Sequence, residues 1–86
     1  MLEDSKIRAF LALVSEGSFT RAARKLGVTQ PAVSAQIASL EKTVGQALFL
    51  RGAELRLTPA GETFLGYAQR IQKAYDLANE AFFPPL

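Results

Sequence analysis

The side chains best suited to recognition chemistry lie close together within residues 18–44. Gln30 and Ser34 carry an amide and a hydroxyl, which can hydrogen-bond to the exposed edges of nucleic-acid bases. Their spacing of four residues places them on one face of a helix. Apart from Lys42, their neighbours on this face are small, so the helix can lie deep in a groove: Pro31, Ala35, Ala38 and Ser39. The pattern predicts a helix that reads base edges in the major groove of DNA.

Positive charge is concentrated around this helix. Residues 17–56 carry six Lys and Arg against two Glu, a net charge of +4, whereas residues 1–16 and 57–86 carry −1 each. Contacts to phosphate need such a local excess of positive charge. We expect five basic side chains to hold phosphates: Arg21, Arg24, Lys25, Lys42 and Arg51. The alternative for any one of them is an ordinary solvated surface charge.

The composition excludes several classes of chemistry. The 86 residues contain no cysteine and no histidine, which excludes disulfides, the common thiolate and imidazole metal sites and His-based triads. The acidic residues Glu41, Glu54 and Glu62 show no arrangement that suggests catalysis. We therefore expect no catalytic residue, no metal and no cofactor, and a protein that is not an enzyme.

The sequence also bears on location. Its start is acidic and lacks the layout of a signal peptide. The longest early apolar run, residues 9–14, is too short to span a membrane. These features predict a cytoplasmic protein without membrane contact, and binding to DNA would associate it with the nucleoid.

Two short helices must position the polar side chains. Ser18 is suited to cap the first helix and Thr29 the second, with Pro31 in its first turn. Gly27 can end the first helix in a left-handed conformation, and Val28 is expected to plug the turn. Both helices have apolar stripes: Phe19, Ala22, Ala23 and Leu26, then Val33, Ile37, Leu40 and Val44. The layout is typical of a helix-turn-helix; the alternative is an ordinary helical hairpin in a small core.

A further helix is expected before this pair. It runs from a cap at Asp4 or Ser5 to about Glu16 and has a core stripe at helical spacing: Ile7, Phe10, Leu11 and Val14. We assign it a scaffold role, because it closes the small core behind the helix pair.

A small β-hairpin, or wing, is expected after the pair. Residues 48–51 and 55–58 read as its strands and residues 52–54 as its turn. From the wing, Arg51 and Arg56 can reach phosphate or the minor groove. Equally, one of them can pair with a neighbouring acid, Glu54 or Glu41.

A long final helix is expected from Pro59, capped by Thr58, to about Phe83. Apolar residues recur in it at steps of four and three, the spacing of helices that pair: Gly61, Phe64, Ala68, Ile71, Tyr75, Ala78 and Phe82. One small domain cannot cover so long a helix, so we expect a homodimer. Its interface is predicted at Phe64, Ala68, Ile71, Tyr75, Ala78 and Phe82, with Gly61 and Phe64 also folding back on their own domain.

The predicted fold is therefore mainly α. Residues 1–58 form a winged helix-turn-helix of three helices and a hairpin, and residues 59–86 form a linker and dimerisation helix of the same module.

Over almost its whole length the chain resembles the DNA-binding module of the LysR-type transcriptional regulators. The motif runs are residues 10–14, 16–23, 26–34, 36–37, 40–41, 48–49, 51 and 57–61. The resemblance implies a winged helix-turn-helix whose linker helix pairs antiparallel with its counterpart in a homodimer. It also implies transcription control in bacteria, with double-stranded DNA as the partner and often a second domain that binds a small effector.

The resemblance implies roles for matching positions. Gln30, Pro31, Ser34 and Ala35 match base-contact positions, while Ser18, Thr20, Thr29 and Arg51 match positions used on the DNA backbone or in the wing.

The chain departs from the pattern of these regulators at two places. Ala35 stands where many relatives carry a basic residue, so a methyl contact to thymine is available but a bidentate guanine contact is not. The wing is one residue short and lacks the basic residue that often follows the Arg51 position. No part of the sequence matches the effector domain of these regulators, so the chain is either a fragment or a stand-alone module, and we favour the fragment. A small effector is then expected to act only through a C-terminal domain that this chain does not contain.

Two functions of different classes follow from these observations. The leading hypothesis is a sequence-specific DNA-binding transcriptional regulator that binds a two-half-site operator as a dimer. The alternative is a protein-interaction module, which would form dimers without salt-dependent binding to DNA.

Overall fold

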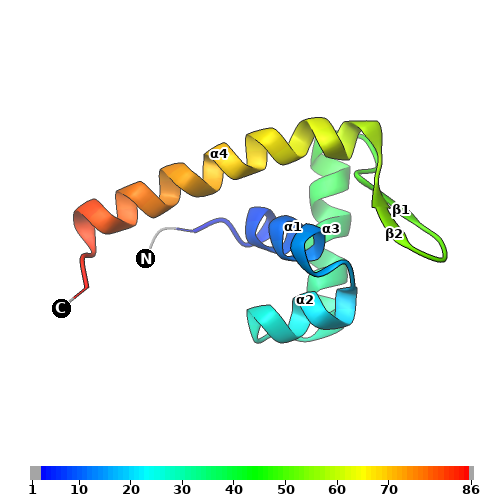
Figure 1. Ribbon diagram of the computed structural model, residues 1–86, viewed down its shortest axis with the longest axis horizontal. Coiled ribbons are helices and arrows are strands. Elements are labelled where there is room, and N and C mark those ends of the chain that lie inside the picture. Colours follow the sequence, from blue (N-terminus) through cyan, green and yellow to red (C-terminus); the bar gives the residue numbers. More distant parts are fainter. Residues whose placement is uncertain (1–2, 86) are drawn as a thin grey trace.

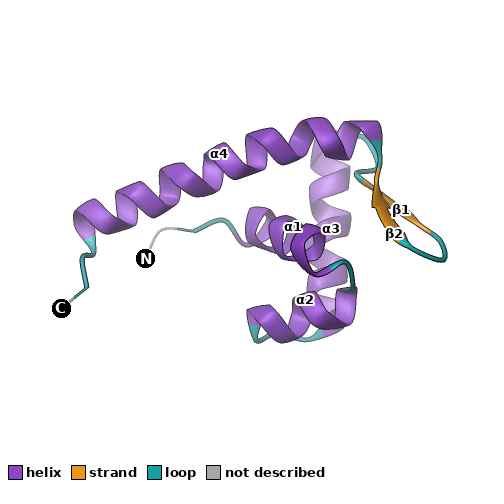
Figure 2. Cartoon of the chain, in the orientation of Figure 1, coloured by secondary structure: helices purple, strands orange, loops and turns teal. Residues whose placement is uncertain are grey.

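The computed structural model describes residues 3–85, which form four helices and a two-stranded hairpin (Figures 1 and 2). The elements are α1 (Ser5–Glu16), α2 (Phe19–Leu26), α3 (Gln30–Val44), β1 (Phe49–Arg51), β2 (Leu55–Leu57) and α4 (Pro59–Phe82). The first three helices pack into a body, the hairpin projects from one end of it, and α4 crosses the body and extends beyond it. The predicted architecture is confirmed.

Each helix begins at a side chain that caps it. The side chains of Asp4, Ser18, Thr29 and Thr58 accept hydrogen bonds from backbone N–H groups in the first turns of α1, α2, α3 and α4, respectively. Of the two caps considered for α1, the chain uses Asp4, which accepts from two backbone N–H groups. The start of every helix is therefore set by local sequence.

The core is centred on Phe10 of α1, which is fully buried. Its ring centroid lies 5.3 Å from that of Phe49 in β1 and 5.0 Å from that of Phe64 in α4. Aromatic pairs in such tilted and edge-on geometries add to the stabilisation that burial provides. Ile37 of α3 and Leu48, just before β1, are also fully buried. α1 thus acts as the predicted scaffold, because its side chains join the helix pair, the wing and α4.

The wing is shorter than predicted. β1 and β2 pair antiparallel, with Phe49 opposite Leu57. Leu48, predicted in the first strand, lies buried at the base of the hairpin, where its carbonyl accepts a hydrogen bond of 3.0 Å from the Thr58 N–H. The Thr58 hydroxyl donates to the Ala47 carbonyl at 2.7 Å. These two bonds join the base of the wing to the start of α4.

The turn between α2 and α3 differs from the prediction in one respect. Val28 was expected to plug the turn, but its side chain is 47% exposed. Ala22 and Ala23 are buried and already fill the crossing. The Val28 N–H donates to the Ala23 carbonyl at 3.0 Å, so Val28 contributes its backbone to the turn.

The face of α4 that packs on the body contains Gly61 and Ala68, both buried. The prediction that Ala68 lies in a dimer interface is wrong, because its side chain is fully buried within its own chain. Phe64 packs on Phe10, as expected for a residue that folds back. The helix ends at Phe82, one residue before the predicted end.

Gly61 marks the closest approach of α4 to the wing base, and it generates a stability prediction. A Cβ placed there would lie 2.1 Å from the Leu48 carbonyl oxygen, far inside van der Waals contact. Gly61→Ala should therefore lower the free energy of unfolding by about 1–3 kcal/mol, despite the better helix propensity of alanine. Urea unfolding of the purified protein measures this change.

Gly66 provides the matched control in the same helix. A Cβ there meets nothing within 4 Å, so Gly66→Ala should raise the free energy of unfolding by about 0.5–1 kcal/mol. Equal effects of the two substitutions would contradict the close contact at Gly61.

Candidate nucleic-acid interface

The helix pair α2–α3 is held at a fixed crossing. Ala22 and Ala23 are buried, so the two backbones can approach closely. Gly27 adopts φ of +68°, the left-handed conformation that lets α2 end and the chain reverse. Thr29 then caps α3 by accepting from the Ala32 N–H. The geometry is that of a helix-turn-helix, in which the second helix presents its outer face.

The outer face of α3 carries the predicted base-reading residues. Gln30, Pro31 and Ala35 are exposed and Ser34 is half-buried. The opposite face is buried in the core through Val33, Ile37 and Leu40. The structure thus brings all four predicted residues to one face, at the N-terminal end of α3.

The threonine and serine hydroxyls near this face have defined partners. Ser18 and Thr29 use their oxygens to accept cap hydrogen bonds, which leaves each O–H able to donate to a phosphate. The hydroxyl of Thr20, on α2, lies 3.3 Å from Oε1 of Gln30, on α3. The structure therefore connects a residue predicted to contact the DNA backbone with one predicted to contact bases.

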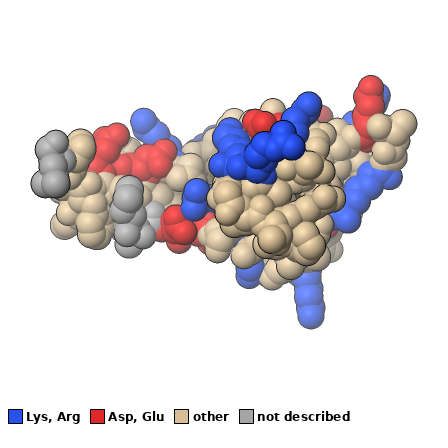
Figure 3. All heavy atoms as spheres, turned by 90° about the horizontal axis from the view of Figure 1, so that it is seen from below, with Lys and Arg blue, Asp and Glu red and all other residues tan. Residues whose placement is uncertain are grey.

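Two of the predicted phosphate-contact residues carry charges without internal partners. Within residues 3–85, the exposed side chains of Arg24 and Lys42 form no ion pair and no hydrogen bond. Figure 3 views the molecule from the side on which α2 lies, and there Lys and Arg side chains border a broad uncharged area. Positive charge beside an uncharged surface suits a groove lined by phosphates.

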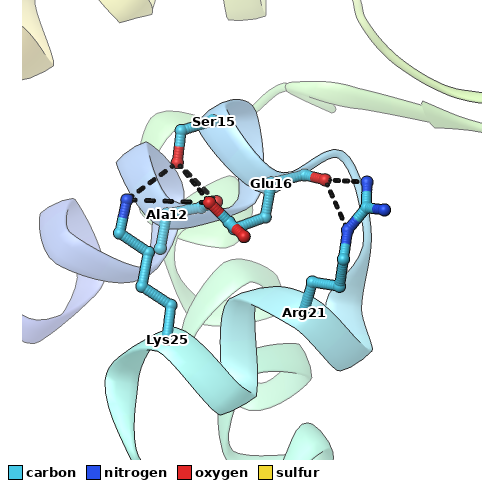
Figure 4. A network of polar contacts seen from close by, with 5 residues as sticks. All are labelled: Ala12, Ser15, Glu16, Arg21 and Lys25. Atoms are coloured by element: carbon cyan, nitrogen blue, oxygen red, sulfur yellow. Dashed lines mark hydrogen bonds and ion pairs between the residues drawn. The ribbon is translucent and has the colours of Figure 1, made fainter.

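Two other basic residues of α2 have partners at the end of α1 (Figure 4). The guanidinium of Arg21 donates from Nε, at 3.1 Å, and from Nη2 to the Glu16 carbonyl oxygen, one of the last carbonyls of α1. Lys25 Nζ lies 3.7 Å from the Glu16 carboxylate and donates to Ser15 Oγ at 3.2 Å. The sequence analysis does not predict this structural role. The feature that could have indicated it is the position of Arg21, five residues after the end of α1.

Arg51 of the wing is held between two side chains from the helix pair. Its Nη2 lies 3.8 Å from Oε1 of Glu41, near the end of α3. Its guanidinium also lies over the ring of Phe19, at the start of α2, 4.9 Å from the centroid. Besides this ion pair, Oε2 of Glu41 accepts hydrogen bonds from the backbone N–H groups of Leu48 and Phe49, at 2.7 and 3.3 Å, which the sequence does not predict. One carboxylate thus joins α3 to the wing.

Arg56 also has an acidic partner. Its Nη2 lies 3.1 Å from Oε2 of Glu54, and both side chains are largely exposed. The sequence leaves open whether Arg51 or Arg56 pairs with one of the acids Glu41 and Glu54. In the structure Arg51 pairs with Glu41, and Arg56 pairs with Glu54. An exposed pair of this kind contributes little stability, so a phosphate can displace it at small cost.

The outer face of α4 differs from the predicted seam. Tyr67, Ile71 and Phe82 are exposed large apolar side chains, whereas Tyr75 is half-buried. Ala74 is exposed and Ala78 is half-buried; with Tyr67, Ile71 and Phe82 they recur at steps of three and four along one side of α4. The apolar stripe is therefore rotated from the predicted one, with Tyr67 and Ala74 in place of Ala68 and Tyr75.

The described residues offer neither a membrane span nor a metal site. No helix within residues 3–85 combines the length and apolar character that a membrane span requires. Among the same residues, no three Asp or Glu side chains gather where they could hold a metal ion.

The crossed helix pair, the exposed small-residue face of α3 and the adjoining hairpin define a winged helix-turn-helix domain. A family model described as "Bacterial regulatory helix-turn-helix protein, lysR family" matches residues 5–62, and the chain belongs to this family.

Relatives with curated names agree with this assignment. The chain is 44% identical over 75 residues to a probable nitrogen assimilation transcriptional activator of Synechocystis sp., covering 87% of this chain and 24% of the relative. It is 47% identical over 77 residues to the HTH-type transcriptional regulator BudR of Klebsiella aerogenes, covering 86% of this chain and 52% of the relative. The chain thus spans between about a quarter and a half of the length of these two relatives.

Solved structures share the fold. The BenM DNA-binding domain in a complex with catB site 1 DNA superposes with a TM-score of 0.87 at 38% identity, covering 94% of this chain and 92% of that one. The CbnR DNA-binding domain in a complex with DNA gives a TM-score of 0.85 at 31% identity, with 93% of each chain covered.

The double role of Glu41 generates a prediction. Glu41→Ala leaves the Leu48 and Phe49 N–H groups without their acceptor at a half-buried position, so we expect the free energy of unfolding to fall by about 1–3 kcal/mol. Denaturant titration followed by circular dichroism measures the loss.

Glu54→Ala is the control for the removal of a carboxylate in the wing region. The ion pair of Glu54 with Arg56 is exposed, so the free energy of unfolding should change by no more than about 1 kcal/mol. A Glu41 variant as stable as the Glu54 variant would show that the carboxylate does not hold the wing.

Proposed function

We propose that this chain is the DNA-binding part of a transcriptional regulator, which binds a two-half-site operator as a homodimer with α3 in the major groove. The observation that carries the proposal is the outer face of α3. Apart from Lys42 its side chains are uncharged, and it presents the Gln30 amide and the Ser34 hydroxyl at its N-terminal end. Lys42 and Arg24 of the helix pair have no ion-pair partner within residues 3–85. Relatives of the same family are named as transcriptional regulators, and two similar domains were solved with DNA.

Base edges and phosphates are contacted by different residues in this proposal. Gln30 and Ser34 hydrogen-bond to base edges, while Pro31 and Ala35 provide close apolar contact, for example to a thymine methyl group. Arg24 and Lys42 neutralise phosphates directly, since they have no internal partner to give up. The other contacts to the DNA backbone come from residues with partners in the free chain: Ser18, Arg21, Lys25, Thr29, Arg51 and Arg56.

Dimerisation is assigned to the outer face of α4. Tyr67, Ile71, Ala74, Ala78 and Phe82 lie on it, and pairing with the same face of a second chain would remove their apolar surface from water. Two copies then place two α3 helices on two half-sites related by the dimer axis.

The remaining assignments follow from DNA binding. The protein acts without catalysis, and its work on DNA places it at the nucleoid in the cytoplasm. We assign any response to a small effector to the part of the longer relatives that this chain does not match.

Selection from a random DNA pool, followed by sequencing, tests the proposal. The wild-type protein should enrich a motif with two related half-sites. Gln30→Ala should relax the preference at one base pair of each half-site, at a cost of about 1–3 kcal/mol, because a hydrogen bond to a base edge is removed. Enrichment of no motif, with no binding at low salt, would refute DNA reading and favour a protein-interaction module.

Arg24→Ala is the contrasting variant, because a phosphate contact carries no sequence information. It should weaken binding to all sequences alike. The slope of the logarithm of the association constant against the logarithm of the salt concentration should become less steep by about 0.9 for each phosphate that is no longer neutralised. Lys73→Ala, which removes an exposed charge from α4, should leave the slope unchanged.

Ile71→Glu tests the dimer. A carboxylate in the middle of the apolar face of α4 should raise the dimer dissociation constant about tenfold or more. This corresponds to a loss of about 1.4 kcal/mol in the free energy of dimerisation. Sedimentation equilibrium measures the constant. Gln69→Glu introduces the same charge on another side of α4 and should leave it unchanged; equal effects of both variants would place the interface elsewhere.

A further inference from the structure

A hydrogen bond joins the two helices of the interface at its surface. The hydroxyl of Thr20 donates to Oε1 of Gln30 across 3.3 Å. The two residues are ten positions apart and come from different helices. Both side chains are exposed on the side of the helix pair that carries the outer face of α3.

The backbone on both sides of this contact is firmly placed. Thr20 is the second residue of α2, close to its cap at Ser18, and Gln30 is the first residue of α3, directly after its cap at Thr29. The buried Ala23 fixes the crossing between them. The hydroxyl therefore approaches the amide from a defined direction.

The contact restricts a side chain that is otherwise free to rotate. An exposed glutamine has several rotamers, and holding one of them on a base edge costs conformational entropy. A threonine hydroxyl both donates and accepts, so it can hold the amide in either orientation. The Gln30 amide nitrogen and the second lone pair of Oε1 remain available, which is the donor and acceptor pair that adenine requires.

We infer that Thr20 is a specificity-determining positioning residue, whose hydroxyl holds the amide of Gln30 on the base edge that it reads. The inference rests on the proposed DNA binding by α3. In the free domain the hydrogen bond between Thr20 and Gln30 is exposed to water and contributes little stability. In the major groove of bound DNA, where water is excluded, the same hydrogen bond becomes stronger. Thr20 thus acts on sequence preference through Gln30, rather than on overall affinity through a phosphate.

The test compares three variants on the motif that the wild-type protein enriches. Thr20→Val keeps the shape of the side chain and removes the hydroxyl, Thr20→Ser keeps the hydroxyl, and Thr43→Val makes the same change at an exposed threonine near the far end of α3. Gln30→Ala identifies the base pair concerned. Affinities are measured for the enriched site, for sites altered at that one base pair and for random DNA, at two salt concentrations.

The expected result is a loss of discrimination at a single base pair. Thr20→Val should reduce the preference at the Gln30 base pair by about threefold to tenfold, with the affinity for random DNA and the salt slope unchanged. Thr20→Ser should retain the preference, and Thr43→Val should leave it unaltered. In the Gln30→Ala background, Thr20→Val should have no further effect, because the amide it positions is gone.

Two results would overturn the inference while DNA binding stands. If Thr20→Val weakens binding to all sequences equally and flattens the salt dependence, the hydroxyl supports a phosphate contact instead. If the preference at the Gln30 base pair is unchanged, the hydrogen bond has no role in recognition. A wild-type protein that enriches no motif would refute the proposed function itself, and with it this inference.

Discussion

The close crossing of α2 and α3 is the constraint on which the rest of the recognition surface depends. Ala22 and Ala23 carry side chains small enough for two helical backbones to pass in contact, and Gly27 lets the chain reverse directly after α2. Once the crossing is fixed, burial of Val33 and Ile37 determines the rotation of α3 about its own axis. The face left outside is the one that carries Gln30 and Ser34.

Electrostatic contacts divide the basic residues into two groups. Arg21 and Lys25 reach back to the end of α1, and Arg51 joins the wing to the helix pair through Glu41 and Phe19. Arg24 and Lys42 have no such partner within residues 3–85. A positive charge with an internal partner must give up part of that interaction to bind phosphate, whereas an unpartnered charge gives up only its hydration.

α4 serves two purposes with two different faces. One face packs on the body through Gly61 and Ala68, and the base of the wing is joined to its first turn by Thr58. The other face is apolar and uncovered along its length, with Tyr67 and Ile71 exposed. The same helix therefore holds the wing and the body together with one face and leaves an apolar face uncovered, the face to which we assign dimerisation.

The sequence by itself determined the helices, their starts and the buried side of α3. Caps such as Ser18 and Thr29, the left-handed Gly27 and an apolar stripe at helical spacing all act within one or two turns of chain, so local sequence is sufficient to specify them. Only the tertiary structure decided which face of α4 meets the body and which partners Glu41 and Arg51 take. Apolar residues cover more than one side of α4, and periodicity alone cannot choose between Ala68 and Tyr67. That choice depends on the shape of the core around Phe10, and the contact of Arg51 with Phe19 joins residues that come together only after folding.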